Sequence, residues 1–144
     1  MTSVYEEVYR RSMSDPQGFW GQVAEDIVWQ RRWDRVFDDS RPPYYRWFTG
    51  GRLNTCENAL DVHVDRGRGK QQALIYDSPV TDTVRVWTYQ ELRDEVARMA
   101  GALRRLGVGK GDRVILYMPM VPEAVMAMLA CARIAITASG TIGM

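Results

Sequence analysis

The sequence predicts an α/β protein in which an N-terminal arm of helices and aromatic residues precedes the start of a parallel sheet. Three observations support this fold class. Residues 114–118 form a short apolar run typical of a buried strand. An amphipathic stripe at 92–106 separates this run from an earlier strand, which is the order of a βαβ crossover. The apolar helix expected at 122–134 lies close to residue 144, so we expect a truncated sheet.

The arm, residues 1–48, is expected to begin with two helices. Ser3 and Glu6 have the spacing of a capping box. Asp15 followed by Pro16 is typical of a second helix start. The apolar residues of the second helix recur at helical spacing: Phe19, Trp20, Val23 and Ile27. The aromatic residues that follow lie outside any clear strand or helix pattern, so we expect them to fasten the arm to a larger body.

A second domain is expected to begin in residues 49–134, and residues 135–144 form an atypical tail. Asn54, with Glu57 three residues later, marks the start of a helix that Gly67 and Gly69 end. One face of this helix is expected to carry Cys56, Leu60, His63 and Val64. Residues 73–76 and 84–87 are short strands separated by turn residues, which predicts a hairpin.

The strongest amphipathic helix follows the hairpin. Thr88 and Glu91 form a capping-box pair, and Gly107 has the position of a C′ residue. The predicted apolar face consists of Leu92, Val96, Met99, Leu103 and Leu106. A parallel strand at 113–118 and a helix at 122–134 complete the expected order of elements.

Composition excludes several classes of function. The net charge of +1 argues against a nucleic-acid surface, and we interpret Arg31, Arg32 and Arg35 as one solvated helix face. Cys56 and Cys131 lie far apart, which disfavours a disulfide framework or a zinc site and suits a reducing cytoplasm. We expect no secretory signal at the N-terminus and no membrane span, because prolines and Glu123 interrupt the longest apolar run.

Four features are candidates for chemistry. His63, with Asp61 two residues away, is interpreted as structural because the pair lies on different helix faces. The glycine-rich segment 107–111 precedes a strand, whereas a phosphate loop follows one. Residues 117–120 lie where open α/β sheets bind ligands, but we favour a role in shaping the turn. The Gly/Ser/Thr-rich tail 137–144 resembles a phosphate loop that lacks a following lysine.

Taken together, several stretches resemble the N-terminal part of the AMP-forming short-chain acyl-CoA synthetases of the adenylate-forming superfamily. The similarity runs in order through residues 4–134. Its motifs lie at 15–16, 19–20, 47–54, 58–63, 88–92, 109–114, 117–123 and 128–134. Residues 56–59 and 73–81 look like the propionyl-CoA synthetase branch. The sequence departs from the family at Ala135, where members continue into a glycine-rich turn that approaches CoA.

The resemblance implies the N-terminal part of a propionate (or acetate)–CoA ligase. In such a ligase, a short carboxylate attacks the α-phosphate of ATP to give an acyl-adenylate and pyrophosphate, with Mg²⁺ as the metal. The CoA thiol then displaces AMP to give the thioester. No catalytic, cofactor-binding or metal-binding residue of the family maps onto this chain, so we expect the chain alone to be inactive and to bind neither ATP nor CoA with full affinity. Exposed apolar surface makes self-association an expectation. The alternative is a non-enzymatic module that pairs with another subunit.

Overall fold

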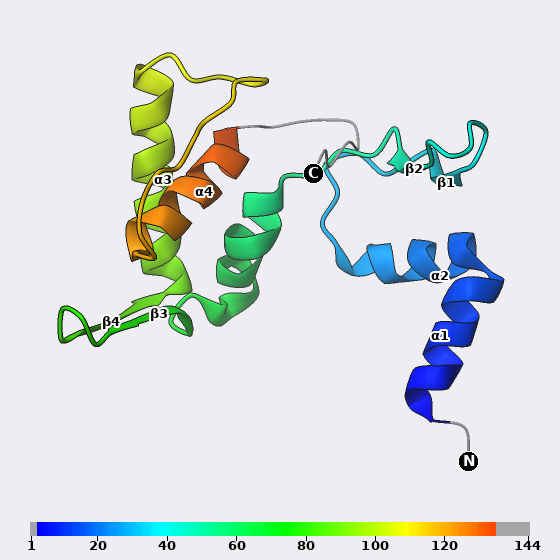
Figure 1. The fold of residues 1–144 in the computed structure, drawn as a ribbon, viewed down its shortest axis with the longest axis horizontal. Coiled ribbons are helices and arrows are strands. Elements are labelled where there is room, and N and C mark those ends of the chain that lie inside the picture. Colours follow the sequence, from blue (N-terminus) through cyan, green and yellow to red (C-terminus); the bar gives the residue numbers. More distant parts are fainter. Residues whose placement is uncertain (1–2, 135–144) are drawn as a thin grey trace. The chain divides into compact units, whose positions relative to one another are not determined.

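The computed structural model of the chain describes residues 3–134. These residues fall into two compact units, 3–53 and 54–134, and each unit contains its own two-stranded antiparallel hairpin (Figure 1).

The first unit begins with two consecutive helices whose predicted caps are confirmed. In α1 (Val4–Ser14), the Ser3 hydroxyl accepts the N–H of Glu6 at 3.2 Å, and the Glu6 carboxylate accepts the N–H of Ser3 at 2.9 Å. In α2 (Pro16–Val23), the Asp15 carboxylate accepts the N–H of Gly18 at 2.9 Å. A turn of 3₁₀ helix, η1 (Ala24–Asp26), ends the helical part of the unit.

A hairpin of β1 (Arg35–Asp38) and β2 (Arg46–Thr49) follows, with Phe37 opposite Trp47. The expectation that the aromatic residues lie outside any strand is therefore wrong for this pair. The interpretation of Arg31, Arg32 and Arg35 as a helix face is also wrong. The backbone of Arg31 forms an isolated antiparallel β-bridge with that of Arg52, and Arg35 begins β1. Four-residue strands are too short to show a periodic pattern, and their pairing depends on residues eight to fourteen positions apart.

Aromatic contacts hold the first unit together. The rings of Trp29, Trp33 and Phe48 lie 4.9–5.3 Å apart between centroids. The Trp29 indole also donates to the Ala24 carbonyl at 2.9 Å. Such edge and tilted contacts add to the burial of each ring, so Trp29, Trp33 and Phe48 form a half-buried aromatic cluster within the unit.

Asp38 is the buried carboxylate of the hairpin, at 7 % exposure. It accepts hydrogen bonds from the Ser40 N–H at 3.1 Å and from the Arg46 guanidinium at 2.6 Å. The Ser40 hydrogen bonds and the Arg46 cation hold the pKa of Asp38 well below its usual range. The two strands are thereby joined beside their connecting loop by an ion pair between Asp38 and Arg46.

The second unit begins with a helical segment of largely π character, η2 (Glu57–Asp61) and η3 (Val64–Arg68). As predicted, the Asn54 side chain caps it by accepting the N–H of Glu57 at 3.1 Å. Gly67 kinks its last turn, with a φ of 81° that an L side chain rarely adopts.

The predicted hairpin is confirmed as β3 (Gln72–Ser78) and β4 (Thr83–Thr88). The helix α3 (Tyr89–Arg105) follows, with its capping box formed by Thr88 and Glu91. A Schellman motif ends it: the N–H of Gly107 donates to the carbonyl of Arg104 at 3.0 Å, and that of Val108 to Leu103 at 3.1 Å. Gly107 has a φ of 88°, as a C′ residue requires.

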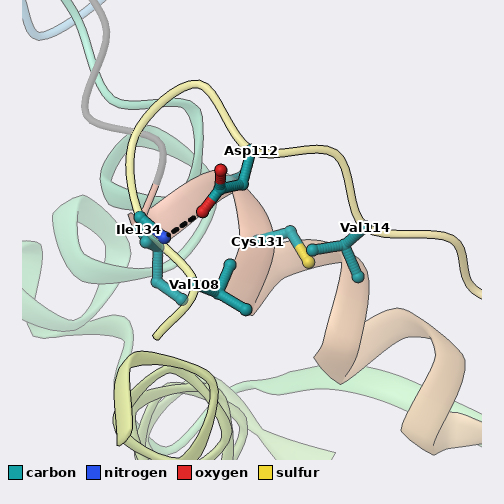
Figure 2. A pocket seen from close by; sticks show the side chains of 7 residues that line it. Val108, Asp112, Val114, Cys131 and Ile134 are labelled. Carbon is teal, nitrogen blue, oxygen red and sulfur yellow. Dashed lines mark hydrogen bonds between the residues drawn. The ribbon is translucent and has the colours of Figure 1, made fainter. Parts of the chain in front are cut away.

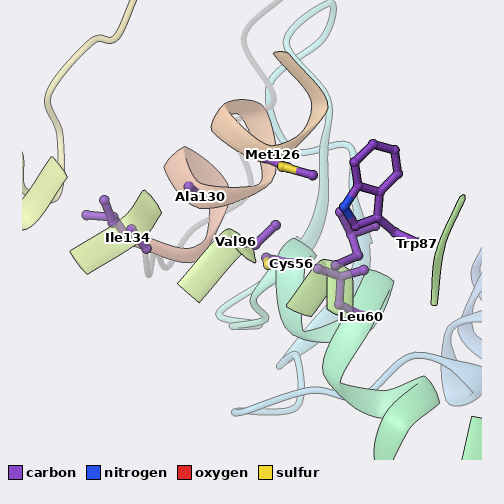
Figure 3. Close-up of a cluster of buried hydrophobic side chains, with 9 residues drawn as sticks. Cys56, Leu60, Trp87, Val96, Met126, Ala130 and Ile134 are labelled. Carbon is purple, nitrogen blue, oxygen red and sulfur yellow. The ribbon is translucent and has the colours of Figure 1, made fainter. Parts of the chain in front are cut away.

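The core of the second unit lies between the segment 55–63, β4, α3 and α4 (Pro122–Ile134) (Figure 3). Its buried members are Cys56, Leu60, Trp87, Leu92, Val96, Ala100, Met126, Ala130 and Ile134. Met99 and Leu103 pack against this cluster as predicted, but Leu106 is 81 % exposed. The prediction for Leu106 is wrong because α3 ends at Arg105, so the next residue leaves the helical face.

The predicted strand at 113–118 is not formed. Residues 113–120 are a loop, and both sheets within residues 3–134 are antiparallel hairpins (Figure 1). Within those residues no parallel sheet is present. The physical reason is that a strand needs a neighbour for its N–H and C=O groups, and no strand of residues 3–134 pairs with this segment.

Candidate functional site

One hollow of the second unit is an open pocket of about 240 Å³ between the loop after α3 and the last turns of α4 (Figure 2). It is lined by Val108, Gly109, Asp112, Val114, Cys131, Ala132 and Ile134. The Schellman motif at the end of α3 directs the chain into this loop, and α4 supplies the opposite wall. Both walls of the pocket therefore come from segments that the core of the second unit holds in place.

The polar groups of this pocket form a turn rather than a reactive pair. The Asp112 carboxylate accepts the N–H of Gly109 at 2.7 Å, as the dashed line in Figure 2 marks. Cys131 is half-buried and contributes the only thiol among the lining residues. A thiol nucleophile needs an adjacent base or cation; the lining residues include no cation, and their one carboxylate, that of Asp112, accepts the Gly109 N–H. This pocket has a shape but no acid–base or nucleophilic machinery.

A second hollow, of about 230 Å³, lies over β4 and α3. The Arg85 guanidinium stacks over the Trp87 ring at 4.3 Å from its centroid, and Arg98 pairs with Glu95 at 2.5 Å. Two more carboxylates, Glu91 and Asp94, complete the lining together with Val86. Mixed charges neutralise one another here, so the hollow does not favour a triphosphate.

His63 and Asp61 are directed to different partners. His63 Nδ1 lies 3.1 Å from Arg68 Nη1, where an arginine can only donate, so the imidazole accepts at this nitrogen. Its ring lies 4.8 Å from that of Tyr89. Asp61 instead pairs with Arg133 at 2.5 Å. A histidine held by an arginine and lacking its carboxylate is a poor general base.

A partly buried polar cluster joins the two ends of the second unit. Arg133 near the end of α4 binds Asp61, and its carbonyl accepts the Asn54 side-chain amide at 3.2 Å. Hydrogen bonds to Asp61 and Cys56 raise the pKa of Arg133 although burial opposes them. Burial raises the pKa of the Cys56 thiol, which is fully buried. Cys56 is therefore a protonated core residue.

Sequence reasoning did not find this cluster. Arg133 lies more than seventy positions after Asn54 and Asp61 in the sequence. Nothing in the local pattern around Asp61 indicates that it pairs with an arginine in α4. The helical period of α4 could have shown only that Arg133 follows its apolar stretch. The cluster fixes the C-terminal end of α4 to the first helix of the unit.

The other sequence candidates are distributed over loops. The glycine-rich segment 107–111 caps α3 and then turns at Gly111, whose φ is 95°. Residues 117–120 lie in the exposed loop before α4, with Tyr117 fully exposed. The tail 137–144 lies outside the described residues. In residues 3–134 no group of three or more His, Cys, Asp or Glu side chains is arranged to hold a metal ion, and no helix there is long and apolar enough to cross a membrane.

The fold of the chain is similar to that of a solved synthetase. The acetoacetyl-CoA synthetase from Streptomyces lividans matches 93 % of this chain with a TM-score of 0.81 and 37 % sequence identity, and the match covers 21 % of that enzyme. The predicted fold class, the start of an adenylate-forming domain behind an N-terminal arm, is confirmed by this match.

Curated relatives give the same result at higher identity. An acetyl-coenzyme A synthetase of Deinococcus radiodurans is 51 % identical over 130 residues, which is 90 % of this chain and 20 % of the relative. The human mitochondrial acyl-CoA synthetase short-chain family member 3 is 46 % identical over 132 residues, 92 % of this chain and 19 % of the relative. An uncharacterized protein of Pseudomonas aeruginosa is 52 % identical over 139 residues, 96 % and 22 % respectively. The chain thus spans about a fifth of the length of the curated relatives it matches.

Two family models divide the sequence between them. Residues 5–59 match the acetyl-coenzyme A synthetase N-terminus, and residues 61–141 match the AMP-binding enzyme family. The second match alone covers more than half of the 144 residues. This chain therefore belongs to the AMP-binding enzyme family, and it corresponds to the N-terminal region of its short-chain acyl-CoA synthetases.

Proposed function

We propose that this chain is a scaffold portion of an AMP-forming ligase that makes short acyl-CoA thioesters. The substrates are a short carboxylate, with propionate favoured over acetate, together with ATP and CoA, and the reaction passes through an acyl-adenylate. Mg²⁺ serves the triphosphate. We further propose that the chain alone is inactive, because its role is to shape and support the domain that carries the chemistry.

One observation carries this proposal: the chain belongs to the AMP-binding enzyme family, but its described residues do not assemble the groups that adenylation needs. The adenylation step needs a positioned cation beside the α-phosphate and backbone N–H groups around the triphosphate. In residues 3–134, the partly buried Arg133 is engaged by Asp61, and neither hollow combines a cation with a free anion-binding loop. The relatives that match are acyl-CoA and acetyl-CoA synthetases about five times as long.

The preference for propionate rests on likeness to one branch of the family. Residues 73–81 and 56–59 carry that likeness, and they form β3 with its turn and part of the helix behind it. These elements support the unit rather than line a reactive pocket. The finer specificity is therefore a proposal about the parent protein and calls for a substrate comparison.

A cytoplasmic location is part of the proposal. Both cysteines are unpaired thiols, Cys56 being buried and Cys131 half-buried. Free thiols suit a reducing compartment. The parent protein is proposed to act on small molecules, without nucleic-acid or membrane partners.

The test has two parts, each read by ATP–pyrophosphate exchange that depends on the carboxylate. The 144-residue chain should match a no-protein blank with propionate and with acetate. A chimaera that joins residues 1–134 to the rest of the Deinococcus radiodurans acetyl-coenzyme A synthetase should be active with acetate. Turnover by the chain alone, or a folded chimaera without exchange, would contradict the proposal.

Propionate preference is tested on the parent. The DNA on both sides of the coding segment shows whether the reading frame continues, and the longer product can then be assayed with both acids. Higher kcat/KM for acetate would refute the propionate assignment.

The second candidate function is a non-enzymatic module that pairs with another polypeptide. The exposed apolar loop at 113–120 favours it, because such a surface is rarely left wet in a monomer. A reading frame that stops at residue 144 under its own promoter would support the module over the ligase.

A further inference from the structure

The surface of α4 gives its packing little direction. Of its thirteen residues only Glu123 and Arg133 carry a charge, and the others are apolar. Two of the residues that it buries are Ala127 and Ala130, whose methyl groups project little from a helix. Apolar burial is non-directional. It therefore does not by itself fix how far α4 lies along its own axis relative to the rest of the second unit.

The polar cluster at the C-terminal end of α4 supplies that direction. Arg133 Nη2 donates to Asp61 Oδ2 at 2.5 Å, and the Arg133 carbonyl accepts the Asn54 side-chain amide at 3.2 Å. Asn54 is buried, and its side-chain oxygen is held in turn by the N–H of Glu57 at 3.1 Å. One residue of α4 is thus bound through both its side chain and its backbone. A shift of α4 by one turn, about 5.4 Å, would break both contacts.

The cluster is a costly way to gain stability alone. The side chains of Asp61 and Arg133 are only 23 % and 28 % exposed, so both charges have lost much of their hydration. Arg133 Nε is buried and has no hydrogen-bond partner among residues 3–134, which adds the cost of an unpaired donor. Apolar side chains of similar volume often replace such a pair without loss of stability. The contacts are therefore better explained by the geometry that they select.

We propose that Asn54, Asp61 and Arg133 are positioning residues that fix the axial register of α4. Their effect on the reaction is indirect: an error in this register would misplace the reacting groups of the parent ligase without removing any of them. The proposal rests on the proposed function for the reaction that the register serves. The register itself is a property of this chain and can be measured without activity.

The register is tested on the 144-residue chain with the double variant Asp61→Leu, Arg133→Met, which replaces the ion pair by apolar side chains. We expect the urea midpoint of the helical circular dichroism to shift by less than about 0.5 M, because apolar contacts offset the lost pair. Hydrogen exchange of the amides of residues 128–134, followed by mass spectrometry, should nevertheless accelerate roughly tenfold or more, because the end of α4 is no longer held.

Two further variants isolate the contacts. Glu95→Met with Arg98→Met replaces an ion pair of the same 2.5 Å length that lies within α3, so hydrogen exchange at residues 128–134 should stay unchanged. Asn54→Ser keeps an oxygen that can cap a helix but lacks the amide that reaches the Arg133 carbonyl. This variant should accelerate hydrogen exchange at residues 128–134 roughly two- to tenfold.

Positioning is tested on the chimaera with the Deinococcus radiodurans enzyme, by carboxylate-dependent ATP–pyrophosphate exchange. The double variant Asp61→Leu, Arg133→Met should lower kcat, per folded molecule, roughly tenfold to a hundredfold. The KM values for ATP and acetate should stay within about threefold, because the binding groups remain present. Arg133→Lys keeps a cation opposite Asp61 and should lose less of kcat than the double variant.

Each outcome decides the matter. Unchanged hydrogen exchange at residues 128–134 in the Asp61→Leu, Arg133→Met variant, or equal acceleration in the Glu95→Met, Arg98→Met control, overturns the register. A fall of the urea midpoint by more than about 1 M assigns the cluster to stability and also overturns it. An active chimaera whose kcat is the same in the Asp61→Leu, Arg133→Met variant rejects positioning and leaves the ligase function standing. An inactive, folded chimaera together with accelerated hydrogen exchange contradicts the ligase function and leaves the register standing.

Discussion

Replacing Leu92 by alanine is expected to destabilise the second unit by about 4 kcal/mol. Leu92 is 3 % exposed and belongs to the core cluster beside α4 and the segment 55–63. Removing three carbon groups forfeits about 2.4 kcal/mol of burial at about 0.8 kcal/mol each. A residual cavity of roughly 75 Å³, at about 24 cal/mol per Å³, accounts for the rest.

The matched control lies on the same helix. Leu106→Ala makes the same chemical change at a side chain that is 81 % exposed, and it should cost less than about 0.5 kcal/mol. Leu92→Met keeps the volume and should cost less than about 1.5 kcal/mol. This variant keeps the comparison usable if Leu92→Ala does not fold, since the whole stability of a domain is typically about 5–15 kcal/mol.

The assay is hydrogen exchange of the α3 amides by mass spectrometry, because peptide-level exchange separates the second unit from residues 3–53. Urea titration of the helical circular dichroism provides an independent midpoint. If Leu92→Ala and Leu106→Ala accelerate α3 exchange equally, the assignment of the buried face of α3 is wrong, whatever the titration shows.

Three further outcomes follow from polar contacts. Thr88→Ala should cost about 1 kcal/mol in urea titration because it removes the capping box with Glu91; no change would mean that α3 does not need its cap. The hydrogen bonds that lower the pKa of Asp38 stabilise the β1–β2 hairpin above the ordinary aspartate pKa of about 3.9, and this contribution is lost as pH falls through the lower folded pKa. Tryptophan fluorescence against pH should therefore show Asp38→Asn weakening the first unit at pH 7, and weakening it progressively less as the pH falls below about 4. A double-mutant cycle of Asp61→Asn and Arg133→Met should give a coupling of about 1–3 kcal/mol in urea titration, and zero coupling would refute the partly buried pair.

Local signals in the sequence were sufficient for the helix caps. Ser3, Asp15, Asn54 and Thr88 each act on an N–H three residues away, so the interaction that makes the cap is contained in the motif that predicts it. The β3–β4 hairpin was predicted for the same reason, since its two strands are adjacent in sequence.

The β1–β2 hairpin could not be predicted in the same way, because its four-residue strands are too short to show alternation and residues 39–45 separate them, whereas only residues 79–82 separate β3 from β4. No local pattern specifies its register, which places Arg35 opposite Thr49. The apolar pattern at 113–118 correctly describes side chains suited to a strand, but strand formation also needs a partner backbone. Of the candidate site, the sequence indicated that His63 lacks a catalytic partner, yet it gave no sign that Arg133 is the group that Asp61 binds.

The Asn54 side-chain amide donates a hydrogen bond to the Arg133 carbonyl, so residues 54 and 133 are in direct contact. The second unit consequently has adjacent entry and exit points, a geometry that tolerates circular permutation. A short linker from residue 134 back to residue 54, with new termini cut at the exposed Val80 turn, would preserve every core contact of Figure 3. We therefore expect the unit to tolerate insertion into a surface loop of another protein through its adjacent ends.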